Sequence, residues 1–190
     1  MDRRTFLQSV TAATALGTLT LETGMAKTQE KPSTEKDSMK KIIVAADPFA
    51  VGLKDAIVAD LKAQGYDVTD VGATAEKEIP YYESAVVACQ LLQADKDARG
   101  ILLCGSGMGM SIVANKFKGI SASVVESVFA AKMCRAINNA NVLCLGAMIW
   151  GEWMAKEAVN VFLNTKFTEG LEGLSDFLHD AVKKVDAIEG

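Results

Sequence analysis

The chain is poor in the residues that hold metals and in those that bind nucleic acids. Its 190 residues include a single histidine, His179, and no pair of its four cysteines has the spacing of a metal site. Acidic residues outnumber basic ones by 24 to 20, which gives a formal net charge of −4. Nucleic-acid binding requires a basic face. We therefore expect no metal, no cofactor and no nucleic-acid partner.

Long hydrophobic runs are also missing, and the apolar run at residues 10–21 is too short to cross a membrane. It follows Arg3 and Arg4 and precedes small residues at 24–26, which is the order of a twin-arginine export signal. An ordinary amphipathic helix is the alternative. We expect residues 1–26 to be a removable signal, with no stable membrane anchor after its removal. The mature protein would then be periplasmic, or otherwise exported through the twin-arginine route.

The remaining chain divides into a linker and one domain. Residues 27–39 are polar and charged, which is typical of a flexible linker. Residues 40–190 form the expected domain, and hydrophobic residues, at 49% of the chain, suffice for a full core. Cys89, Cys134 and Cys144 fall in apolar patterns, where cysteine packs as a small hydrophobe. We expect all four cysteines to be free thiols.

Strand-like and helix-like segments alternate from residue 41 onward. Apolar strands separated by helices indicate a parallel sheet with both faces covered. Right-handed crossovers make this a doubly wound α/β fold, a three-layer Rossmann-like sandwich. An added C-terminal helix is expected over 174–188, where apolar residues recur at the helical spacing of a core or subunit contact. The expected strands are 41–46, 66–71, 100–103, 120–125 and 142–145, and the expected helices before the last are 51–64, 82–93, 110–117, 128–137 and 152–163.

The loop after the third expected strand is the most informative stretch. Cys104 stands at the strand tip, and Gly105, Gly107 and Gly109 follow it into the next helix. Ligands of doubly wound sheets bind beyond the carboxyl ends of the strands, where this loop lies. Small residues let a ligand approach the backbone, and free N–H groups at a helix start stabilise a thiolate or an anionic transition state. An inert, half-buried cysteine in an ordinary turn is the alternative, and the glycine spacing argues against a dinucleotide site.

Three blocks resemble the family of type B ribose-5-phosphate isomerases and galactose-6-phosphate isomerase subunits, and the resemblance covers about residues 40–168. Residues 42–47 are similar to the family's first strand, and residues 138–146 (NNANVLCLG) are similar to its Asn-rich segment. Ser106 replaces the threonine of the family's cysteine loop. The other positions of the family's loop motif are matched by Cys104, Gly105, Gly107, Gly109, Ser111, Ala114, Asn115 and Lys116.

The resemblance implies an aldose–ketose isomerase that acts on a small-molecule sugar through an enediolate, as a homodimer or a dimer of dimers. It implies that Cys104 is the base, that Ser106 relays a proton or donates a hydrogen bond, and that Asn138 steadies the enediolate oxygens. Tyr82 is a candidate for stacking on the sugar, with packing as the alternative. The other substrate-binding residues that the resemblance implies are Asp47, Gly105, Gly107, Gly109, Ser111 and Asn115.

The chain departs from the family where histidine and arginine are expected. Pro48 stands in place of one histidine, and Ile137 in place of the ring-opening histidine. Residues 169–175 (EGLEGLS) replace an arginine-rich phosphate-binding segment, and acidic groups repel a phosphate dianion. These departures favour a non-phosphorylated sugar as substrate. The alternative is a catalytically inactive sugar-binding or structural member of the family.

Overall fold

The computed structural model describes residues 41–188. The predicted signal (1–26) and linker (27–39) lie outside the described residues, and so do residues 40, 189 and 190.

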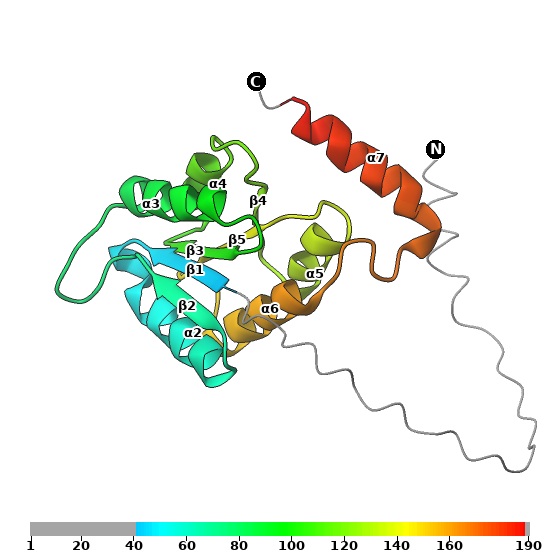
Figure 1. Ribbon diagram of the computed structural model, residues 1–190. Coiled ribbons are helices and arrows are strands. Elements are labelled where there is room, and N and C mark those ends of the chain that lie inside the picture. The colour runs from blue at the N-terminus through cyan, green and yellow to red at the C-terminus, as the bar shows by residue number, and fades with distance from the viewer. Residues whose placement is uncertain (1–40, 189–190) are drawn as a thin grey trace, which may run out of the picture. The chain divides into compact units, whose positions relative to one another are not determined.

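Five parallel strands form one sheet in the order β2-β1-β3-β5-β4. The chain first adds β2 on one side of β1 and then crosses to place β3 on the other side. This reversal is a topological switch point, where doubly wound sheets bind their ligands. The predicted doubly wound α/β fold is therefore confirmed, with its switch point between β1 and β3 (Figure 1). The strands are β1 (Lys41–Ala46), β2 (Asp67–Asp70), β3 (Arg99–Cys104), β4 (Ala122–Val124) and β5 (Val142–Gly146).

Helices cover both faces of the sheet, so the strands alternate between two apolar cores (Figure 1). Ile42 and Val44 of β1 face α2, α5 and α6, whereas Ile43 and Ala45 face α3 and α4. Period-two alternation on a doubly covered sheet explains why the strands are almost wholly apolar. Burying each Ile or Leu in this way contributes about 1.5–3 kcal/mol. The helices are α2 (Val51–Ala63), α3 (Tyr81–Ala94), α4 (Met108–Ala114), α5 (Val128–Ala136) and α6 (Glu152–Asn164), and the 3₁₀ turn η1 (Pro48–Ala50) precedes α2.

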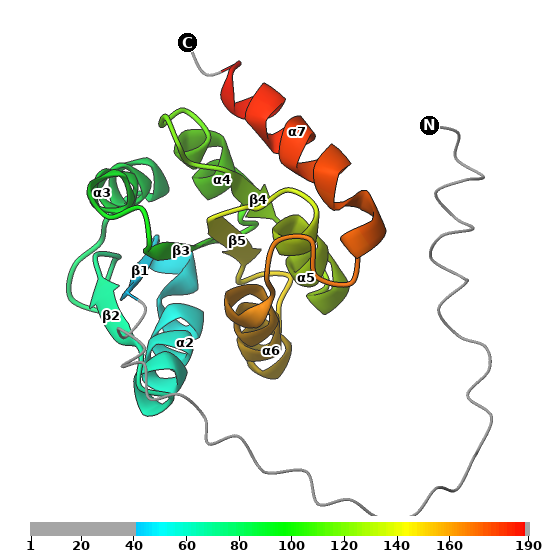
Figure 2. The same ribbon diagram turned by 45° about the vertical axis from the view of Figure 1, so that its right-hand side comes forward.

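The added C-terminal helix is present as α7 (Ser175–Asp186), after the short 3₁₀ turn η2 (Glu172–Leu174). Leu178 is the one residue of α7 that is buried. Phe177 and Val185 are 59% and 60% exposed, although both belong to the apolar stripe. A groove of about 830 Å³ lies between this stripe and residues around β4 and the end of α5, and Figure 2 shows α7 running past α4 and α5. The apolar stripe of α7 is thus only partly covered by its own chain.

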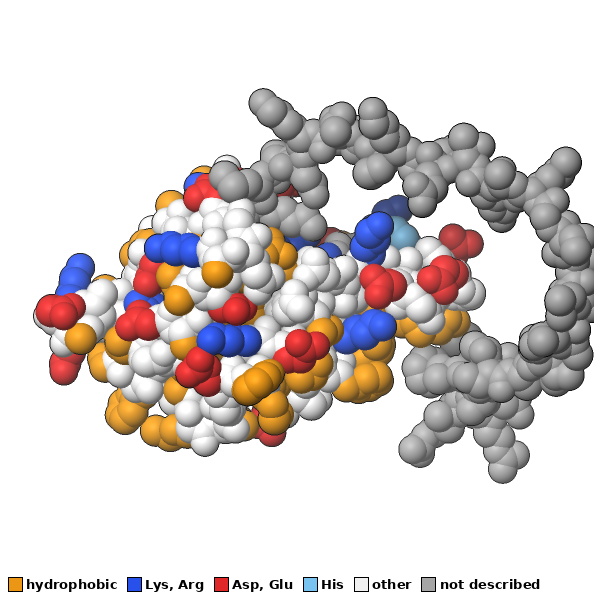
Figure 3. Space-filling view, turned by 90° about the horizontal axis from the view of Figure 1, so that it is seen from below, with side chains coloured by type: hydrophobic (Ala, Val, Ile, Leu, Met, Phe, Trp, Pro, Cys, Tyr) orange, Lys and Arg blue, Asp and Glu red, His pale blue; other side chains and the backbone are white. Residues whose placement is uncertain are grey.

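Within residues 41–188, none of the helices combines the length and apolar character needed to traverse a bilayer. On the face shown in Figure 3, acidic and basic side chains are interspersed. That face therefore carries no continuous basic surface.

Candidate active site

Cys104 and Asp47 come together at the switch point. Ala46 pairs with Leu103 across the β1–β3 ladder, and the Asp47 N–H donates to the Leu103 carbonyl at 3.1 Å. Each residue therefore leaves its strand at the carboxyl edge, directly beside the other strand. Both are almost buried, with 6% of Cys104 and 7% of Asp47 exposed. Both residues were predicted to lie at the carboxyl ends of their strands, and the strand pairing places them there.

The turn after β3 directs a backbone N–H at the cysteine sulfur. The Gly107 N–H donates to the Cys104 Sγ atom over 3.1 Å. The thiolate is the reactive form of cysteine, and this N–H is placed to donate to the sulfur. Gly107 has φ = +78°, and a Cβ there would come within 2.9 Å of the Leu145 carbonyl carbon. Glycine is therefore required at this position for both conformation and space.

The segment after β5 braces the same loop. The Ala147 N–H donates to the Cys104 carbonyl and the Met148 N–H to the Gly105 carbonyl, both over 2.9 Å. A Cβ on Gly146 would lie 2.7 Å from the carbonyl carbon of Ser106, so β5 ends in close contact with the loop backbone. These contacts hold the loop on two sides while leaving Ser106 partly exposed. Its hydroxyl lies 3.4 Å from the Met108 nitrogen.

Asp47 is held by the turn that it caps. Its Oδ1 atom accepts a hydrogen bond from the Phe49 N–H at 3.0 Å, which begins η1. Burial raises the pKa of the Asp47 carboxyl above its ordinary value, while hydrogen bonds from the Phe49 and Ala50 N–H groups act in the opposite direction. The Asp47 carboxylate can therefore accept a hydrogen bond from a sugar hydroxyl that enters the site.

A buried ion pair supports the backbone just before Asp47. Lys54, 1% exposed, donates to Asp70 Oδ2 at 2.6 Å and contacts Asp55 Oδ1 at 3.0 Å. The second oxygen of Asp70 accepts from the Gly72 N–H at 2.9 Å. Gly72 packs so closely on β1 that a Cβ there would lie 2.3 Å from the Ala46 nitrogen. The sequence alone does not reveal the role of Lys54, because an isolated lysine in an amphipathic helix gives no sign that it will be buried.

Ser111 and Asn115 lie one helical turn apart on and just after α4, and both hold the edge strand β4. The Asn115 amide donates to the Ala122 carbonyl at 2.9 Å and accepts from the Ala122 N–H at 2.8 Å. The Ser111 hydroxyl lies 3.3 Å from the same carbonyl. The structure thus gives these two side chains a structural role, and their contact with substrate stays a prediction.

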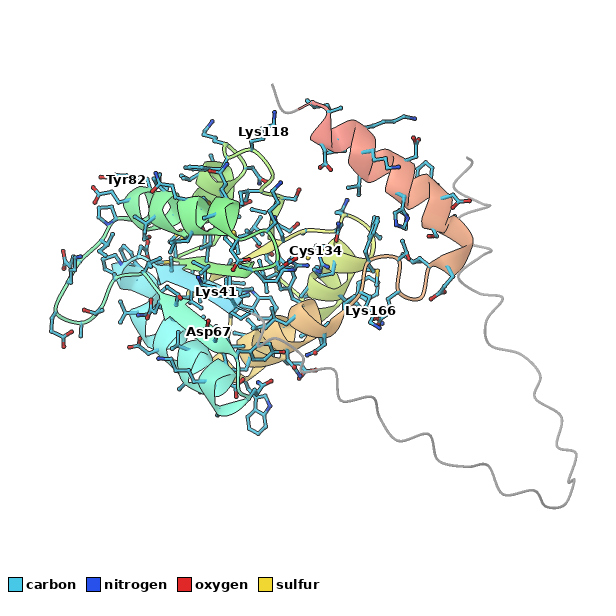
Figure 4. The ribbon with its side chains drawn as sticks, in the orientation of Figure 1. Lys41, Asp67, Tyr82, Lys118, Cys134 and Lys166 are labelled. Carbon is cyan, nitrogen blue, oxygen red and sulfur yellow. The ribbon has the colours of Figure 1, made fainter. Side chains whose placement is uncertain are left out.

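Asn138 lies at the opposite edge of the sheet from Cys104. In the β3–β5 ladder Gly100 pairs with Val142 and Cys104 with Gly146. Asn138 precedes Val142 by four residues, and the strand from Gly100 to Cys104 spans about 13 Å. Lys41 and Asp67, which begin β1 and β2, mark this amino edge in Figure 4. One chain therefore does not bring Asn138 to Cys104; instead Asn138 lines the groove beside α7.

Of the two tyrosines at the start of α3, Tyr81 is the one that contacts the loop. A Cβ on Gly109 would lie 2.8 Å from Cε2 of Tyr81, so the ring packs against the Gly109 backbone. Tyr82 is 51% exposed and meets Tyr81 edge to face, with 5.4 Å between the ring centroids. Figure 4 shows Tyr82 at the amino end of α3. Tyr81, rather than Tyr82, is therefore the tyrosine placed to contact a sugar at the loop. The stacking of Tyr82 on the sugar stays a prediction.

The remaining candidates for chemistry are few. All four cysteines are buried free thiols, and burial raises the pKa of Cys89 and of Cys134 to about 11. Within residues 41–188, no group of three or more His, Cys, Asp or Glu side chains could hold a metal ion. Cys104 is the one cysteine that combines a backbone N–H donor with a position at the switch point.

Residues 42–174 match the protein family described as Ribose/Galactose Isomerase. The chain belongs to this family. Every residue of the switch-point site described above lies within the matched range. Membership of this family identifies the chain as an aldose–ketose isomerase, as the sequence resemblance implied.

Relatives of the chain include isomerases of short sugars. It is 44% identical over 151 residues to a 4-deoxy-4-sulfo-D-erythrose isomerase from Clostridium sp. (strain MSTE9), covering 78% of this chain and 95% of the relative. It is 42% identical over 135 residues to a D-erythrulose-4-phosphate isomerase from Pectobacterium atrosepticum, covering 70% and 88%. The solved structure of Clostridium thermocellum ribose-5-phosphate isomerase B superposes with a TM-score of 0.71 at 33% identity, covering 78% of this chain and 97% of that one. These Ribose/Galactose Isomerase relatives share the fold and differ in the substrates that they are named for.

Proposed function

We propose that this protein is an aldose–ketose isomerase that acts on a non-phosphorylated sugar by proton transfer through an enediolate. The observation that carries the proposal is the Cys104 thiol, which accepts a hydrogen bond from Gly107 N–H beside Asp47 at the switch point. A base near the reacting carbon and a donor for the developing oxyanion are the two groups that this reaction needs.

Cys104 acts as the base when it is a thiolate. It removes the proton from the carbon beside the carbonyl, the C–H electrons form the C=C bond of the enediolate, and the carbonyl π electrons move onto oxygen. The proton then returns from sulfur to the former carbonyl carbon. The Ser106 hydroxyl relays the second proton between the two enediolate oxygens. Asp47 holds a neighbouring sugar hydroxyl.

The loss of cationic groups supports a substrate without phosphate. The segment that would bind phosphate in the family contains Glu169 and Glu172 and no arginine. Glu169 accepts from the Lys166 N–H and Glu172 from the Gly170 N–H, so both carboxylates fold back onto this segment. The relative named for 4-deoxy-4-sulfo-D-erythrose carries a sulfonate in its substrate's name, and no phosphate. A sulfonate bears one negative charge, whereas a phosphate monoester bears nearly two at neutral pH.

Turnover of a defined sugar panel tests the substrate. We expect kcat/KM for 4-deoxy-4-sulfo-D-erythrose to exceed that for D-erythrulose 4-phosphate and ribose 5-phosphate by about tenfold or more, because an unpaired dianion is costly to desolvate. A preference for either phosphorylated sugar would contradict the substrate assignment. Binding of a sugar without any turnover across the panel would favour the inactive sugar-binding alternative.

We also propose that the active form is a homodimer or a dimer of dimers. The only partly covered apolar stripe of α7 and the distance between Asn138 and Cys104 support this assignment. In a twofold assembly, the Asn138 of one copy can reach the Cys104 loop of the other, since an isologous interface brings different edges of two chains together. The role proposed for Asn138 depends on such a partner.

We propose that the protein reaches the periplasm, or is otherwise exported, through the twin-arginine route, on the basis of the pattern in residues 1–26. Replacing Arg3 and Arg4 together by lysine should leave the uncleaved chain in the cytoplasm of the producing cells. The measurement is fractionation followed by mass determination. Equal export of the wild-type and double-lysine chains would contradict the proposed route.

A further inference from the structure

We propose that Met148 is a specificity-determining residue of this site and disfavours a phosphate group on the bound sugar. The assignment rests on the proposed function, because it concerns the substrate of the same Cys104 loop.

Met148 is anchored to the loop by its backbone and covers it with its side chain. Its N–H donates to the Gly105 carbonyl over 2.9 Å. A Cβ on Gly105 would lie 3.2 Å from the Met148 Cε atom and 3.4 Å from its Sδ atom. The thioether therefore lies directly over the residue that follows Cys104. Met148 is nevertheless 72% exposed, so a ligand that reaches the loop from solvent can contact it.

The opposite end of the loop is also lined by a neutral side chain. The Tyr81 ring packs on Gly109, and Tyr81 is 40% exposed. A sugar that lies against the glycines of the loop is therefore flanked by a thioether and a phenol. Neither group carries a positive charge, and a thioether has no hydrogen-bond donor.

Two basic side chains of the elements around the site are not available to the loop. Lys54 is buried and paired with Asp70 and Asp55. Arg99 begins β3, at the amino edge of the sheet. A phosphate placed against the Met148 thioether would lose part of its hydration and gain no cation from that side chain, which is unfavourable for a dianion. Sugar hydroxyls, or a singly charged sulfonate, lose less by the same contact.

A charge introduced at this position tests the assignment directly. Met148→Lys should lower the KM for D-erythrulose 4-phosphate by about tenfold, because an ammonium group then faces the loop. kcat should stay within about threefold, since the thioether takes no part in the proton transfer. The KM for 4-deoxy-4-sulfo-D-erythrose should change less. Met154→Lys is the matched control: it makes the same charge change at a methionine on α6 that is 53% exposed, and should alter neither KM.

Two readouts separate this assignment from the proposed function. Equilibrium dialysis of D-erythrulose 4-phosphate with each variant gives Kd without any need for turnover. A tenfold lower Kd or KM in Met148→Lys, but not in Met154→Lys, supports the role of Met148 even if the protein proves to be a binder. Equal values in the two variants overturn the role of Met148 and leave the isomerase proposal standing. Absence of turnover by the wild-type chain on every sugar overturns the isomerase proposal alone.

Discussion

Replacing Cys104 by alanine is expected to lower kcat by about a thousandfold, because the reaction loses the thiolate that removes the carbon-bound proton. Binding of the sugar should persist, since Asp47 and the backbone of the loop remain in place. Steady-state kinetics gives the loss in kcat, and equilibrium dialysis gives the retained Kd. We expect little change in the fold, because the carbonyl of residue 104 still accepts a hydrogen bond from the Ala147 N–H.

Cys89→Ala is the matched control for that experiment. Cys89 is another fully buried cysteine, on the face of α3 that packs against the same core. Its removal should reduce stability by about 1 kcal/mol and leave kcat unchanged. Comparable losses of kcat in the two variants would show that burial, rather than chemistry, explains the effect at Cys104.

Two inactive variants should restore activity when they are combined. If Asn138 of one copy serves the Cys104 of another, Cys104→Ala and Asn138→Ala are each impaired as homodimers. Chains mixed by unfolding and refolding form about half heterodimers, each with one intact site of two. The expected activity is then roughly a quarter of the wild-type value. Light scattering should show a dimer or a larger even assembly for each protein.

The same mixture can also contradict the proposal that Asn138 of one copy serves Cys104 of another. If Asn138 acts within its own chain, or has no part in the reaction, mixing restores nothing beyond the average of the two variants. Asn139→Ala, which changes the next residue in the same turn, serves as the control. It should lower stability, because Asn139 accepts a hydrogen bond from buried Arg135 at 3.0 Å, but it should complement nothing.

The layered fold and the position of the cysteine loop could be predicted from the sequence, because both follow from local patterns. Apolar strands between amphipathic helices specify a parallel sheet, and the residue after each strand falls at the carboxyl edge. Cys104 and Asp47 were placed at that edge on this ground, and the β1–β3 pairing confirms it. The helix predicted over 110–117 starts at Met108 and ends at Ala114. Gly107, in the left-handed region, begins it early, and the Asn115 side chain turns to β4.

Other parts of the site depend on tertiary pairing that sequence order does not reveal. The Asn-rich segment at 138–146 gives no distance between Asn138 and Cys104, and the strand register separates them. The buried position of Lys54 depends on Asp70, which is 16 residues away. Met148 lies over the loop because it follows β5, and β5 pairs with β3. That pairing joins strands far apart in the chain and is not evident from the sequence.

Solvent deuterium incorporation is the most direct test of proton transfer by the Cys104 thiol. The wild-type chain, incubated with 4-deoxy-4-sulfo-D-erythrose in heavy water, should place deuterium on the carbon beside the carbonyl. Proton NMR follows the loss of that carbon-bound signal. We expect Cys104→Ala to abolish the exchange and Cys89→Ala to retain it. Exchange at the wild-type rate in the Cys104→Ala protein would contradict the role of Cys104 as the base.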